Sequence, residues 1–174
     1  PGNALVVFFS DPHMNVWEDV LPVTTSLDPR LVRIVNGMDP PPHEIIVAGD
    51  TSTTLSPVPG WIPRPWSMTM GTNEMGYWLE AIRAITNVAP EDIIWIPGNH
   101  DQLAFEEEAE TYRRMYPMMP VRQRLDLAGV RFLLINCGNY GGRNPAQMEW
   151  LRSELDQTPW EQPLVVVNHV PPFH

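Results

Sequence analysis

Short apolar runs that end in a polar cluster are the feature that most constrains how this chain can fold. These runs are rich in Val and Ile, and they occupy Ala4–Phe9, Glu44–Ala48, Ile93–Ile96 and Leu164–Val167. A continuous run of this length is typical of a strand that is buried on both faces. We therefore predict four strands, each followed by a polar loop.

Residues with helical spacing separate these predicted strands. Asp28 and Pro29 suit the N-cap and first turn of a helix, and further helices are predicted over Thr72–Val88, Ala104–Tyr116 and Pro145–Leu155. The segments Arg122–Leu127 and Val130–Ile135 flank Ala128-Gly129, which predicts a β-hairpin. The pattern favours an α/β fold with mixed sheets, in a single domain over residues 1–174.

Charge and cysteine content exclude several classes of protein. The 21 acidic and 11 basic residues give a net charge of −10, which disfavours a protein that coats nucleic acid. No apolar stretch reaches the roughly 18 residues of a membrane-spanning helix, so we expect no membrane association. Cys137 is the single cysteine, which excludes an internal disulfide and a cysteine-based zinc site and favours the cytoplasm.

The polar clusters bring potential metal ligands to one edge of the predicted fold, because ligands of open α/β sheets bind beyond the carboxyl ends of the strands. The residues concerned are Asp11, His13, Asp50, Asn99, His100 and His169. Taken singly, Asp11, Asp50 and His169 more often have a role in a turn, a cap or a core, and Asn99 and His100 are as often bonded to local backbone. Their order and shared position favour a site. Imidazole, carboxylate and amide donors suit Mn, Fe or Zn, and an Asp shared by two cations would bind phosphate and activate water.

These residues resemble the motifs of the calcineurin-like metallophosphoesterases. The matches are Asp11-Pro12-His13, Gly49-Asp50, Gly98-Asn99-His100-Asp101 and His169-Val170-Pro171-Pro172. The segment Asn136–Leu155 also resembles the class III cyclic-nucleotide phosphodiesterase branch. The resemblance implies a four-layer α-β-β-α sandwich with mixed sheets, and hydrolysis of a small phosphate ester by in-line attack of a metal-activated hydroxide.

The resemblance also implies a role for each matching residue. Asp11 and His13 would bind the first of two divalent cations, Asp50 would bridge both cations, and Asn99 and His169 would bind the second. His100 would contact the phosphate and protonate the leaving alkoxide, while Asp101 would orient His100. A histidine suits this acid role because its pKa lies near neutrality.

Two departures from the family pattern affect these expectations. The final Gly-His-x-His is absent, because the sequence ends at His174, so we expect the remaining ligands and further strands to follow in a longer protein. Gly49-Asp50 is followed by Thr51-Ser52-Thr53-Thr54 and lacks the Asp-Arg-Gly motif of the protein Ser/Thr phosphatases of the superfamily, which argues against a phosphoprotein phosphatase.

Two other functions remain open at this stage. A nuclease of the same superfamily would need a basic strip formed by Arg113, Arg114, Arg122 and Arg124, although short charge clusters more often form a solvated, salt-bridged face. A binding scaffold that has lost its chemistry would also fit the missing histidines. The sequence does not assign the oligomeric state, the metal or the physiological substrate.

Overall fold

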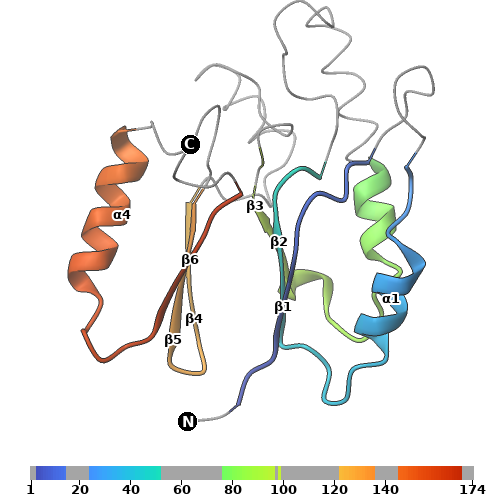
Figure 1. Ribbon diagram of the computed structural model, residues 1–174, viewed down its shortest axis with the longest axis horizontal. Coiled ribbons are helices and arrows are strands. Elements are labelled where there is room, and N and C mark those ends of the chain that lie inside the picture. Colours follow the sequence, from blue (N-terminus) through green and yellow to red (C-terminus); the bar gives the residue numbers. More distant parts are fainter. Residues whose placement is uncertain are drawn as a thin grey trace, which may run out of the picture.

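The computed structural model describes residues 3–14, 24–51, 76–96, 98, 122–135 and 145–169. They form two three-stranded sheets that lie face to face, with helices on the outer sides (Figure 1). The predicted helix Ala104–Tyr116 lies outside these described residues. The prediction of a mixed α/β fold is confirmed.

The first sheet contains the strands that carry three of the four polar clusters. Its strands are β1 (Val6–Phe9), β2 (Glu44–Ala48) and β3 (Ile93–Ile96), in the order β1-β2-β3, and both pairs are parallel. All three strands therefore end at the same edge of the sheet. Helix α1 (Pro29–Asn36) connects β1 to β2, and Asp28 caps it by accepting a hydrogen bond from the Arg30 backbone N–H at 2.7 Å.

The second sheet is mixed, as the sequence predicts. Strands β4 (Arg122–Leu127) and β5 (Val130–Ile135) form the antiparallel hairpin, and β6 (Leu164–Val167) pairs parallel with β5. Ala128 and Gly129 have φ values of 50° and 86°, the left-handed conformation that a two-residue hairpin turn requires. Helix α4 (Pro145–Gln157) provides the crossover from β5 to β6.

Burial follows the alternation of side chains along each strand. On β2, Ile45 and Val47 face α1 and the helical residues 76–82, whereas Ile46 faces the second sheet. Because both faces of β2 are covered, its sequence is apolar from Ile45 to Ala48. A third cluster, which includes Leu133 and Leu151, joins the second sheet to α4.

The prediction that all four strands are buried on both faces is wrong for β1 and β6. Phe8 of β1 is 47% exposed, and Val165 and Val166 of β6 are 38% and 42% exposed. Within the part of the chain that the structure describes, each of these strands pairs on one side only. Side chains of such an edge strand are not covered by a neighbouring strand on the unpaired side, and a local apolar pattern does not show this exposure.

The helix predicted over Thr72–Val88 also ends earlier than the sequence pattern suggests. Its described part covers residues 76–82, and turns follow. The Asn36 side chain bonds the Ala84 carbonyl and the Thr86 N–H at 2.8 and 2.9 Å, and the Asn87 side chain bonds the Val35 carbonyl. The Asn36 side chain thus satisfies backbone groups that a longer helix would otherwise pair, whereas the Asn87 side chain pairs a carbonyl of the last turn of α1.

A buried arginine joins the hairpin to the end of α4. The Arg131 side chain is 8% exposed and donates to Asp126 at 2.9 Å and to the Thr158 hydroxyl at 2.8 Å. Arg124 also donates to Asp126, but on the exposed side. Arg131 and then Arg124 lower the pKa of Asp126, so this network stabilises the fold at neutral pH and loses that effect as the pH falls.

Replacement of Arg131 by Met should lower the free energy of unfolding by about 2 kcal/mol, because buried hydrogen bonds to a charged group are lost. Arg124→Met is the matched control, since it removes the exposed partner of the same Asp126 and should change stability much less. Urea unfolding of both variants measures the difference. Equal losses would show that burial does not distinguish the two arginines.

Candidate metal centre

The loops that follow β1 and β2 are held together by backbone hydrogen bonds. The N–H groups of Asp11 and His13 donate to the carbonyls of Gly49 and Asp50 at 3.0 and 2.9 Å, and Met14 donates to Thr51 at 3.0 Å. Asp11, His13 and Asp50 have positive φ values of 57°, 45° and 54°. Such conformations are unfavourable for residues with a side chain and often mark functional sites.

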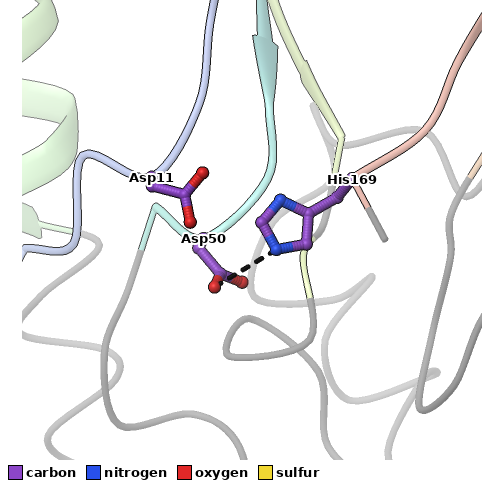
Figure 2. A group of neighbouring side chains, drawn as sticks. All are labelled: Asp11, Asp50 and His169. Carbon is purple, nitrogen blue, oxygen red and sulfur yellow. Dashed lines mark ion pairs between the residues drawn. The ribbon is translucent and has the colours of Figure 1, made fainter. Parts of the chain in front are cut away.

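Three predicted ligands come together at the carboxyl ends of the strands. Asp11 follows β1, Asp50 follows β2 and His169 follows β6, and one ligand atom from each lies within 4.8 Å of the other two. Figure 2 shows Asp50 between Asp11 and His169, with an ion pair of 3.3 Å from His169 Nε2 to Asp50 Oδ2. Asp50 is buried, whereas Asp11 is exposed, so the group is reachable from solvent.

The backbone fixes the orientation of the His169 ring. Its Nδ1 lies 2.7 Å from the Ala48 carbonyl, which can only accept, so Nδ1 carries the donated proton. Nε2 then faces Asp50, and this carboxylate is the main cause that raises the pKa of His169 to about 9. A ring whose other nitrogen donates to a carbonyl is the usual arrangement of a metal-binding histidine.

His13 lies next to the same carboxylates, although it is outside the three-residue group. Its Nε2 is 3.5 Å from Asp11 Oδ1 and 3.6 Å from Asp50 Oδ2. Ligand atoms that bind one ion at about 2.0–2.2 Å lie roughly 3–3.5 Å apart. The spacings around Asp50 are close to that size, so these carboxylates and imidazoles fit a divalent cation.

Two glycines permit this close packing. A Cβ at Gly49, where φ is +88°, would lie 2.6 Å from the His169 ring, and a Cβ at Gly98 would overlap the Asp50 carboxylate. Sequence reasoning treated these glycines only as parts of motifs and missed their role. The signal that could have revealed it is a Gly directly before a polar residue at a strand end.

Asn99, His100 and Asp101 lie outside the described residues, so their roles stay predictions. The described candidate ligands come from both sheets: Asp11 and Asp50 follow the first sheet, and His169 follows the second. The parallel strands of the first sheet account for the meeting of Asp11 and Asp50. The approach of His169 depends on the packing of one sheet against the other.

Comparison with models of known protein families identifies the family of this chain. The model of the calcineurin-like phosphoesterase family matches residues 4–174. The chain is a member of the calcineurin-like phosphoesterase family. A comparison with curated proteins gives no match.

Membership makes this phosphoesterase a metal-dependent hydrolase, and the family normally binds divalent metals. The group of Asp11, Asp50 and His169 provides carboxylate and imidazole donors for such a metal. Within the part of the chain that the structure describes, no helix has the length and apolar character needed to cross a membrane.

Proposed function

We propose that this phosphoesterase hydrolyses a small phosphate ester at a centre of two divalent cations. The convergence of Asp11, Asp50 and His169 carries this proposal. Bound cations of the Mn, Fe or Zn type would supply Lewis-acid activation of the phosphate and of the attacking water. The buried position of Asp50 between its neighbours suits a carboxylate that bridges both cations.

The remaining residues take the roles that the family pattern assigns. Asp11 and His13 hold one cation, and Asn99 and His169 hold the other. His100 donates its proton to the oxygen of the departing alcohol, and Asp101 orients the His100 ring. The proposal includes a four-layer sandwich, a single domain over residues 1–174 and a substrate class that contains cyclic nucleotides.

The nuclease alternative receives no support from Arg124 of the predicted basic strip. Arg124 forms ion pairs with Asp126 and Glu154 at 2.8 and 3.4 Å. Its charge is therefore offset within the protein rather than presented to a phosphate backbone. A small ester is the substrate that better fits a chain with a net charge of −10.

Hydrolysis of bis-p-nitrophenyl phosphate by the full-length protein tests the proposed function. We expect activity that EDTA abolishes and Mn²⁺ restores, and a loss of about 10²-fold or more in His100→Ala, because general acid catalysis typically contributes 10²- to 10⁴-fold. Asn99→Ala should lower activity by weakening metal binding. Activity that survives chelation, or survives both substitutions, would refute the proposal.

Binding of Mn²⁺ should also stabilise the folded protein. A cation that binds only the folded state raises the free energy of unfolding by about 2.7 kcal/mol when its free concentration is 100 times Kd. Thermal unfolding across a Mn²⁺ titration measures this effect, with Ca²⁺ at equal ionic strength as the control for screening. A midpoint that does not respond to Mn²⁺ would argue for the scaffold alternative.

A further inference from the structure

A cavity of about 500 Å³ lies beside the metal centre. It is formed where the chain that leaves β1, around Ser10, meets the chain that enters α1, around Ser26. Cavities of roughly 300–1,000 Å³ are the usual size for small-molecule sites. The cavity is therefore large enough to hold the organic part of a phosphate ester.

Asp11 connects this cavity to the metal centre. It lines the cavity and is also one of the three grouped ligands, whereas Asp50 and His169 do not line the cavity. Asp11 is therefore the residue at which the cavity and the group meet. A group held at Asp11 would therefore lie at the edge of this cavity.

The walls of the cavity combine apolar and hydroxyl groups. Phe9, Leu27 and Leu31 provide apolar surface, and Leu27 is buried. Ser10 and Ser26 add hydroxyl groups that can donate and accept hydrogen bonds. Such walls suit a ring with hydroxyl substituents, because apolar contacts bind its faces while the hydroxyls orient it.

The charge of the described wall residues disfavours an anionic occupant. None of the described residues that line the cavity is basic, and Asp11 and Asp28 carry carboxylates. Asp28 is paired with Arg30 at 2.7 Å, so its charge is offset without leaving a free positive group. A second phosphate in the cavity would lie near these carboxylates and would meet no basic group among the described lining residues, which is unfavourable.

We propose that this cavity binds an uncharged, hydroxylated ring that is esterified to the phosphate. The inference rests on the proposed function and adds the chemical class of the alcohol and the residues that recognise it. The ring packs against Phe9 and Leu31, and its hydroxyl groups bond Ser10 and Ser26. Esters of small alcohols, which leave the cavity empty, are then poorer substrates.

Two diesters with the same leaving group test this inference. Methyl p-nitrophenyl phosphate and thymidine 5′-(p-nitrophenyl phosphate) differ only in the retained alcohol, so the ratio of their kcat/KM values reports the cavity. We expect the full-length protein to prefer the thymidine ester. Ser26→Trp, which fills the cavity from an exposed position, should lower that ratio about tenfold through KM, which corresponds to the loss of about 1.4 kcal/mol of binding.

Ser153→Trp is the matched control, because Ser153 is an exposed residue of α4 that does not line the cavity. In Ser153→Trp, the ratio of the kcat/KM values for the two esters should equal that of the unchanged protein. Hydrolysis of both esters with an identical ratio in the Ser26 variant would overturn the cavity inference and leave the proposed function intact. Hydrolysis of neither ester with any divalent cation would overturn the proposed function and, with it, the inference.

A binding measurement without metal provides a second readout. In EDTA, saturation-transfer NMR should detect thymidine bound to the full-length protein and to the Ser153→Trp variant. The signal should disappear in Ser26→Trp. A signal of equal strength in both variants would show that the nucleoside binds elsewhere and would overturn the assignment of the cavity.

Discussion

Replacement of Asp50 by Asn should abolish tight metal binding and lower hydrolysis by about 10³-fold or more. Asp50 is buried next to both Asp11 and His169, and it is the proposed bridge between the cations. The change removes one negative charge from a site that, in the proposed function, offsets two divalent cations. A loss of about 4 kcal/mol of transition-state stabilisation corresponds to this reduction in rate.

Elemental analysis after dialysis measures the bound metal, and bis-p-nitrophenyl phosphate hydrolysis measures the rate. Asp156→Asn is the matched control, since Asp156 is an exposed aspartate of α4 and should leave both measurements unchanged. Full metal content in Asp50→Asn would contradict the bridging role. Full metal content together with a large loss of rate would show that Asp50 contributes to hydrolysis but not to retention of the metal.

Gly49→Ala should reduce hydrolysis by about 10²-fold, because the new methyl group displaces His169, a candidate metal ligand. Its Cβ would lie 2.6 Å from the His169 ring and 2.7 Å from Gly98 Cα, so either the ring or the backbone must move. A displacement of about 1 Å in a catalytic site can cost this much activity. Overpacking of this kind also costs roughly 1–3 kcal/mol of stability.

Gly129→Ala separates the steric effect from the backbone effect. Gly129 has a φ of +86°, nearly equal to the +88° of Gly49, but a Cβ there would meet nothing within 4 Å. Both variants therefore carry the same left-handed strain, and only Gly49→Ala adds the clash. The hydrolysis rate and urea unfolding are measured for both variants, and Gly129→Ala should keep full activity. An equal loss of activity in both variants would mean that strain alone explains the effect.

Strand positions were predictable because their signal is local. The bounds of β2, β3 and β6 coincide with the predicted apolar runs, since each run is β-branched and stops at a polar turn. The hairpin was also predictable, because Ala128-Gly129 suits a turn with positive φ. The exposure of Phe8 and Val166 was not, because it depends on which strands occupy the edges.

The candidate site was predictable in part for the same reason. The rule that ligands bind beyond parallel strand ends brings Asp11 and Asp50 together, and they do lie together. That His169 reaches them from the other sheet has no local signature. The cavity beside Asp11 depends on how residues 24–31 pack against residues 9–12, which is a tertiary relation that no sequence pattern records.

The position of His169 has a consequence for the mechanical behaviour of the molecule. Its ring bonds the Ala48 carbonyl and faces Asp50, although it extends from the sheet opposite to both. A cation shared by these residues would cross-link the two sheets. Separation of the two sheets would then require the cation to lose ligands, so metal affinity and resistance to unfolding would rise and fall together.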